Sequence, residues 1–409
     1  MDHDLFLKEV EQCPTPYHTV QLAKEKLLGA GYQEILETDT WTNLPSKFFV
    51  IQENISIIAV NIIDNSSAVI LQSLTDTPTL ISESQEIRQK ANFEQILVSP
   101  HGNALWFSWL DKDIGLAGNV VTSEGNKLVH ICPAGIIPSL AAHLNSGVGS
   151  KPKFDIKQNF NPVLNLVKSD HSTDLIHILA NHLNVAPESI INYSLSVTDA
   201  QPPSFIGTDK AFISGHRLSV LSTAIPTLNS FLQVQPTKGT VILSITSTPN
   251  IAFLSRVLKT VLTPSVYRKT LFINVTNGRA KSPNFKTTIT KENFKKVKNE
   301  NPHDVHLGNG PVINWSPRST YGTVGNSAAT IKNIASKINV PISTYILPDN
   351  VVKPQFSEAA EAASLGLKSV EFGVPVLGAD ALRQLICIDD LVNFQKLVNE
   401  IIKNPPTIF

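Results

Sequence analysis

The sequence has little of what marks several classes of protein. It contains only three cysteines, Cys13, Cys132 and Cys387, and no C-x-x-C pair. Such a sparse, odd-numbered set excludes a disulfide framework and a structural zinc finger, and it favours a reducing, cytoplasmic environment. No hydrophobic run approaches the ~18 residues that a membrane-spanning helix requires. The N-terminus is acidic, whereas a secretory signal is basic and then apolar.

The chain also has no excess of charge of either sign. Lys plus Arg number 34, and Asp plus Glu also number 34. This balance gives no electrostatic footprint for nucleic acid or for an anionic membrane surface. Hydrophobic residues make up 42% of the 409 residues, enough to build a sizeable core. Composition therefore predicts a soluble globular protein whose partners are neither nucleic acids nor membranes.

The hydrophobic pattern predicts an α/β fold. Two helices are expected at 4–12 and 17–28, and apolar strands follow at 48–51, 55–63 and 68–74. After residue 206, strands and helices alternate, which predicts a mostly parallel sheet covered by helices on both faces. The stretch between is rich in short strands and turns. We therefore predict one α/β domain formed by 1–82 and 206–409, with 83–205 as an inserted β-rich domain.

Residue spacing alone indicates no catalytic constellation. The sequence has no G-x-S-x-G elbow and no H-E-x-x-H pair. His303 and His306 lie close together in a polar segment, but a metal site needs a further carboxylate or imidazole held nearby. A solvated loop is the favoured interpretation of that pair.

Several short segments, taken in chain order, match the motifs of one known family. Residues 13–18 (CPTPYH) are similar to S-P-T-P-F/Y-H, and 74–78 (LTDTP) to H-T-D-S-P. Further matches are 102–118 (G-N-A-L-W to L-A-G), 137–145 (IPSLAAHLN), 212–218 (FISGHRL), 310–313 (GPVI) and 372–375 (FGVP). Together they resemble the aspartyl aminopeptidase family, which are cytosolic two-zinc exopeptidases that assemble into dodecamers. The resemblance covers nearly the whole chain and implies that the β-rich insert is a dimerisation domain.

The sequence departs from the family pattern where the resemblance places the zinc ligands. The first ligand histidine is replaced by Leu74, the bridging aspartate by Ser219, another aspartate by Thr276 and the last histidine by Asp380. The family's glutamate pair, one of which is the general base, falls on 247–250, a segment without glutamate. Leucine offers no donor atom, and neutral hydroxyls are poor replacements for a carboxylate that bridges two dications.

The resemblance and these departures together predict a catalytically inactive homologue without a cofactor. Such a protein would keep the fold and oligomerisation, from a dimer to a dodecamer, and act in binding, scaffolding or regulation, with an active paralogue or a peptide as a partner. A remnant pocket is expected around Asp76, His303 and Asn314; the family has a lysine at the last position. The alternative is an active metallo-aminopeptidase that removes N-terminal acidic residues, its metal site rebuilt from Asp76, His216, His303, His306 and Asp380. A third interpretation is an unrelated α/β binding protein.

Overall fold

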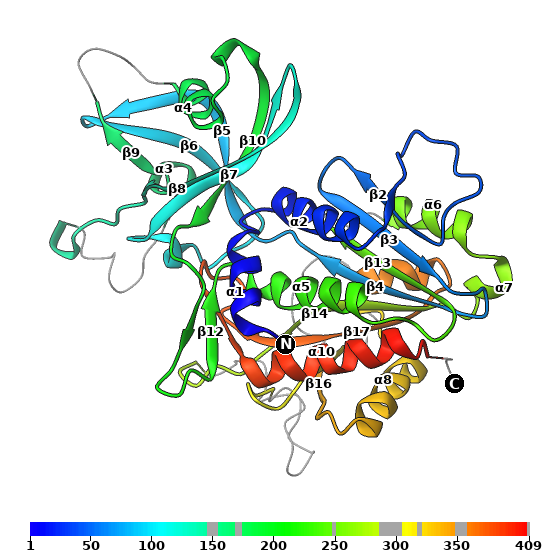
Figure 1. Ribbon diagram of the computed structural model, residues 1–409. Coiled ribbons are helices and arrows are strands. Elements are labelled where there is room, and N and C mark those ends of the chain that lie inside the picture. The colour runs from blue at the N-terminus through cyan, green and yellow to red at the C-terminus, as the bar shows by residue number, and fades with distance from the viewer. Residues whose placement is uncertain are drawn as a thin grey trace.

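The structure is a computed structural model that describes residues 1–144, 154–167, 174–247, 251–285, 305–316, 321–347 and 358–406. A large sheet flanked by helices lies beside a separate β-barrel, and both chain ends lie on the sheet-and-helix part (Figure 1). The α/β fold class predicted from the sequence is confirmed.

The central sheet is parallel in its middle and mostly antiparallel at its flanks. Strands β13, β4, β14 and β17 pair in parallel, whereas most of the other pairs in the sheet are antiparallel. The strand order is β1 (Gln33–Glu34), β2 (Lys47–Gln52), β3 (Ser56–Ile62), β13 (Thr240–Thr246), β4 (Ala68–Leu74), β14 (Leu271–Arg279), β17 (Lys368–Leu377), β18 (Gln384–Cys387), β12 (Phe212–Gly215), β11 (Ser204–Ile206), with β15 (Val312–Trp315) joining β17 to β16 (Ser343–Ile346).

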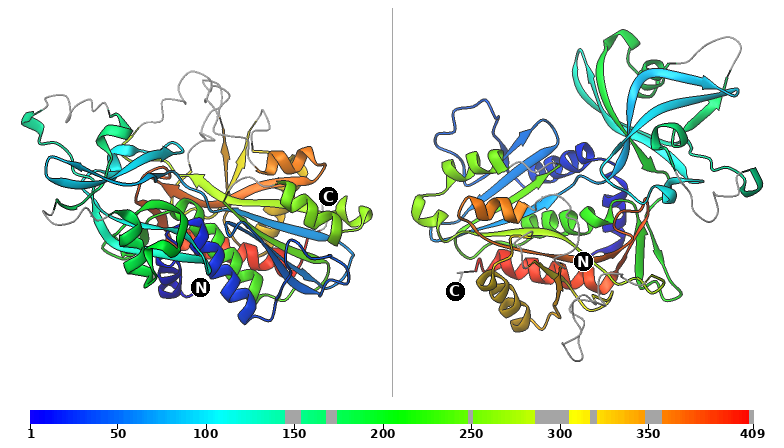
Figure 2. Two further views of the ribbon diagram at one scale, coloured as in Figure 1. Left: turned by 90° about the horizontal axis from the view of Figure 1, so that it is seen from above. Right: turned by 180° about the vertical axis from the view of Figure 1, so that it is seen from behind.

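Helices cover both faces of this sheet, as the views in Figure 2 show. One face carries α1 (His3–Glu11), α2 (Pro16–Gly29), α5 (Leu218–Gln233), α8 (Gly325–Lys337) and α10 (Ile388–Lys403); the other carries α6 (Ile251–Val261), α7 (Pro264–Tyr267) and α9 (Glu358–Ser364). In β13, Val241 and Leu243 pack on the first face and Ile242 on the second, because successive side chains of a strand point to opposite sides. Among the described helices, none has the length and apolar character needed to cross a membrane.

The barrel is closed and has a core of its own. Its strand order is β10 (Ile190–Asp199), β5 (Thr79–Lys90), β6 (Phe93–His101), β9 (Val163–Leu166), β8 (Gly125–Ile136), β7 (Asp113–Thr122). Shorter elements beside it are η1 (Trp106–Trp109), η2 (Ala142–Leu144), α3 (Ile156–Asn159), α4 (Leu175–Leu183) and η3 (Pro187–Ser189). Leu80, Ile96 and Val120 are fully buried in this second core. The domain boundaries at 83 and 205 stay a prediction.

Candidate functional site

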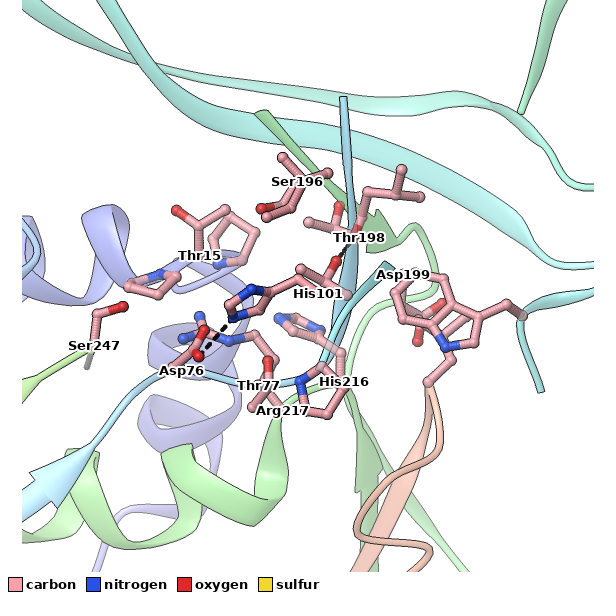
Figure 3. A pocket seen from close by; sticks show the side chains of 18 of the residues that line it. Thr15, Asp76, Thr77, His101, Ser196, Thr198, Asp199, His216, Arg217 and Ser247 are labelled. Carbon is pink, nitrogen blue, oxygen red and sulfur yellow. Dashed lines mark hydrogen bonds and ion pairs between the residues drawn. The ribbon is translucent and has the colours of Figure 1, made fainter. Parts of the chain in front are cut away.

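A pocket of about 170 Å³ lies where the sheet meets the barrel. The chain supplies it from the ends of central strands, because Asp76 follows β4, Ser247 follows β13 and Asp380 follows β17. The turn between α1 and α2 and the barrel strand β10 complete the wall. Its polar side chains gather in one place (Figure 3), and its apolar wall includes Pro14, Pro16, Pro78, Ile81, Trp109 and Val197.

Asp76 and His101 form a pair inside this pocket. The Nε2 atom of His101 lies 2.7 Å from the Oδ2 atom of Asp76, and the two side chains keep 40% and 34% of their surface exposed (Figure 3). His101 ends β6 of the barrel, so this contact joins the barrel to the sheet. The sequence analysis did not identify His101, because no motif or spacing links it to Asp76.

Arg217 is buried at the floor of the pocket and ties three segments together. Its guanidinium donates to the carbonyl oxygens of Cys13 and Thr75. Its backbone has φ of +53°, a left-handed conformation that is uncommon outside glycine, immediately before α5. Burial lowers the pKa of Arg217 to about 10, so the side chain stays charged at neutral pH. The Nε atom has no hydrogen-bond partner among the described residues.

His216 lies next to Arg217 in the sequence, and its imidazole also faces the pocket (Figure 3). The residue is 6% exposed, and neither ring nitrogen has a partner of normal hydrogen-bond geometry in the described part of the chain. Burial, and then the positive charges of Arg217 and Arg383, lower its pKa to about 3. The ring is therefore neutral at physiological pH, with one donor and one acceptor nitrogen.

The positions that the resemblance assigns to zinc ligands lie mostly outside this pocket. Leu74, Ser219 and Thr276 do not line it, whereas Asp380 does. Leu74 ends β4. Thr276 lies in β14, which approaches β17 so closely that a Cβ at Gly373 would lie 1.3 Å from the Thr276 carbonyl oxygen. The Ser219 amide, at the start of α5, donates to Oε1 of Gln384.

Uncharged side chains bind the backbone of one of these positions, Ser219, and bind one another. Nδ2 of Asn277 donates to the Ser219 carbonyl oxygen at 3.1 Å, and Nδ2 of Asn314 donates to the Asn277 carbonyl oxygen at 3.0 Å. Gln384 also donates to the carbonyl oxygens of Ala379 and Ala381. We call Ser219, Asn277, Asn314 and Gln384 the neutral cluster. Asn314, predicted to belong to the remnant pocket, is buried in this cluster, and it does not line the pocket around Asp76.

The residues of the rebuilt metal site are brought together only in part. Asp76, His216 and Asp380 line the same pocket. His306 is exposed and is not part of the pocket wall, and His303 lies outside the described residues. Residues 248–250, where part of the glutamate pair was expected, are also outside them, while Ser247 lines the pocket.

A paired zinc centre does not fit the donors that the structure places. Within the described ranges, no group of three or more His, Cys, Asp and Glu side chains is arranged to hold a metal ion. A catalytic zinc takes about three protein ligands. No chemical step through zinc therefore follows from these residues.

Comparisons with known proteins identify the family. The model of the Aminopeptidase I zinc metalloproteases (M18) matches residues 9–401. A probable M18 family aminopeptidase 2 of Stutzerimonas stutzeri (strain A1501) is 25% identical over 414 residues, which cover 94% of each chain. A relative of the same description from Azotobacter vinelandii (strain DJ / ATCC BAA-1303) is 23% identical over 420 residues, or 96% of each chain.

Solved structures show the same fold. The crystal structure of prApe1 superposes with a TM-score of 0.87 at 18% identity, covering 97% of this chain and 92% of that one. An M18 aminopeptidase from Thermotoga maritima gives 0.80 at 16% identity, with 98% and 95% covered. Ape4 in complex with Nbr1 gives 0.85 at 22% identity, with 97% and 84% covered.

The family match confirms the resemblance and corrects one expectation drawn from it. We expected no cofactor, but the matching family consists of zinc metalloproteases, so that expectation is wrong. Four replaced ligand positions were too narrow a basis for excluding the cofactor of the family. The match says nothing about the individual ligand positions, which stay predictions.

Proposed function

Because the chain belongs to the M18 family of aminopeptidases, we propose that it keeps the family fold without peptide turnover and acts by binding. The observation that carries this proposal is the neutral cluster. Ser219, where the family has its bridging aspartate, is held through its backbone by the side-chain amides of Gln384 and Asn277. A bridging carboxylate neutralises two cations, and an uncharged network of amides cannot replace that charge.

The carboxyl group that contacts the end of β13 is not a suitable general base, which supports the same proposal. Thr246 ends β13, immediately before residues 247–250, where the glutamate pair was expected, and its hydroxyl lies 3.3 Å from Oε1 of Glu358. Burial raises the pKa of Glu358 to about 8, so this carboxyl group is protonated at neutral pH. A protonated acid cannot accept a proton from water. Glu358 also does not line the pocket around Asp76.

The binding role extends to self-association. The resemblance implies that the barrel is a dimerisation domain, and one structural neighbour, mApe1 of S. cerevesiae, is a dodecamer. We infer copies of this chain, an active paralogue or a peptide as partners. A cytoplasmic location is supported by the three unpaired thiols of Cys13, Cys132 and Cys387.

A specific observation favours an active aminopeptidase as the second candidate function. A relative that aligns with 94% of this chain is described as a probable aminopeptidase. That activity would need ligands from the rebuilt site, such as Asp76, His303 and Asp380.

Turnover of aspartyl and glutamyl anilides, with leucyl and alanyl anilides beside them, separates the two candidates. The full chain is assayed with zinc ions supplied, and the Stutzerimonas stutzeri relative is the positive control. We expect release at the rate of the buffer blank. Release that zinc stimulates and a chelator abolishes would establish the active enzyme instead. Native mass spectrometry of the same sample tests self-association, and a strict monomer would contradict it.

A further inference from the structure

The unpartnered polar groups of the pocket are mainly hydrogen-bond donors. Nε of Arg217 and Nε1 of Trp109 are buried, line one pocket and have no partner in the described part of the chain. Both atoms can only donate. The neutral ring of His216 adds one N–H donor and one acceptor nitrogen, and the hydroxyl of Thr198, which can donate or accept, is also without a partner among the described residues. Because buried polar groups in folded proteins are nearly always hydrogen-bonded, this set indicates a ligand that accepts hydrogen bonds.

The charges around the pocket leave Arg217 without an ion pair. No carboxylate in the described ranges forms a salt bridge with it, although Asp76 is near enough to favour its charged form. Asp76 is engaged by His101, and Asp199 is paired with Arg383 at 2.6 Å. The remaining pocket carboxylate, Asp380, is exposed. A buried cation therefore faces the cavity, with Asp76 and Asp199 engaged by other side chains and Asp380 exposed to solvent.

We propose that this pocket binds a small carboxylate whose oxygens accept hydrogen bonds from Arg217, His216 and Trp109. The walls of proline, isoleucine and valine suit a short apolar tail, and about 170 Å³ limits its size. This inference rests on the proposed function, because it names the chemistry of the ligand for a binding role. The carboxylate belongs either to a free short-chain acid or to the C-terminus of a peptide.

Titration of the full chain with four probes tests the proposal. The probes are butyrate, its neutral counterpart butyramide, N-acetyl-dialanine with a free C-terminus, and the amide of that peptide, followed by NMR shifts or calorimetry. At least one acid is expected to bind saturably, about tenfold or more tightly than its amide, because a carboxylate accepts stronger hydrogen bonds than a neutral amide does. The acid that binds identifies the source of the carboxylate.

Variants locate the site. Trp109→Phe and His216→Phe each remove donors and keep an aromatic ring, so each is expected to weaken binding about tenfold. Trp106→Phe is the matched control, because Trp106 belongs to the same η1 segment and does not line the pocket. Circular dichroism shows whether each variant is folded, and Trp109→Phe carries the test if His216→Phe is not.

Three results would overturn the carboxylate site: no saturable binding of either acid, equal binding of acid and amide, or affinity unchanged in the folded donor variants. The titration is independent of turnover. Hydrolysis of anilides would overturn the proposed function and leave the titration to be judged on its own result.

Discussion

The neutral cluster and the pocket are built from opposite kinds of side chain, although both lie at the carboxyl ends of the central strands. In the neutral cluster, Ser219, Asn277 and Gln384 satisfy one another with uncharged groups. In the pocket, Arg217, His101 and Asp76 bring ionisable side chains together, and several donors have no partner. A satisfied network contributes stability, whereas unpaired donors are available for a ligand. The contrast separates side chains that hold the fold from side chains that can bind, and Gln384 belongs to both regions because it also lines the pocket.

Replacing Arg217 has the largest expected effect on this contrast. Arg217→Met would leave the carbonyl oxygens of Cys13 and Thr75 without their donor in a buried place. We expect a loss of about 3–5 kcal/mol in the free energy of unfolding, measured by urea denaturation. The control is Arg256→Met, because Arg256 is 46% exposed in its pair with Glu37. This substitution should lower the free energy of unfolding by less than about 1 kcal/mol. Equal costs would mean that Arg217 does not anchor the pocket floor.

Replacing Gln384 tests the neutral cluster. Gln384→Leu keeps the side-chain volume similar but leaves the Ser219 amide without its acceptor at the start of α5. The expected cost is about 2–3 kcal/mol, the penalty for an unsatisfied buried donor with further lost bonds. Gln89→Leu, on an exposed strand position, should change stability by less than about 0.5 kcal/mol. A cost for Gln384→Leu as small as the control would show that the cluster is not a stabilising network.

Local patterns predicted most elements of the sheet and its helices. The alternation of strands and helices expected after residue 206 includes α10, in which Leu391, Phe394 and Leu397 repeat on one face. The sequence analysis missed α5. Every residue of this helix from Leu218 to Phe231 is buried, including polar ones such as Ser222 and Thr223, and Pro226 lies inside it. A helix that is buried on all sides does not show the alternation of a polar and an apolar face by which periodicity reveals a surface helix.

The site was predictable only where a motif identifies a residue. Asp76 and Asp380 were found through the family resemblance, and both line the pocket. Arg217 was noted only as part of a motif, because its contacts with Cys13 and Thr75 span 204 and 142 positions of the chain. His101 was not identified from the sequence, because its contact with Asp76 spans 25 positions. Contacts of this kind arise from topology, which local spacing does not encode.

Acid should weaken the protein through His216. Its pKa is about 3 in the folded protein and near 6.5 when unfolded, so the unfolded state binds more protons between these values. Stability from this residue is therefore present above pH 6.5 and is lost as the pH falls towards 3. We expect the loss between pH 7 and pH 5 to be about 1–2 kcal/mol. Urea denaturation at several pH values measures it.

His216→Phe provides the comparison for the acid effect, because phenylalanine does not titrate. The variant should lose stability less steeply than the parent between pH 7 and pH 5. His18, whose pKa burial also lowers to about 3, remains in both proteins, so a residual slope is expected. Identical slopes for parent and variant would show that folding does not lower the pKa of His216.

The pair of Asp76 and His101 should have the smallest effect, because both side chains keep more than a third of their surface in contact with solvent. A double-mutant cycle with Asp76→Asn and His101→Gln should give a coupling below about 1 kcal/mol, which is usual for exposed ion pairs. The coupling is measured at pH 7 by urea denaturation and again with butyrate present. A ligand that displaces water from the pocket should increase it, because charges interact more strongly when water is excluded. A coupling above about 2 kcal/mol in the ligand-free protein would show that this pair stabilises the fold, as the neutral cluster does. Among the pocket residues, only Arg217, His216 and Trp109 would then contrast with the neutral cluster.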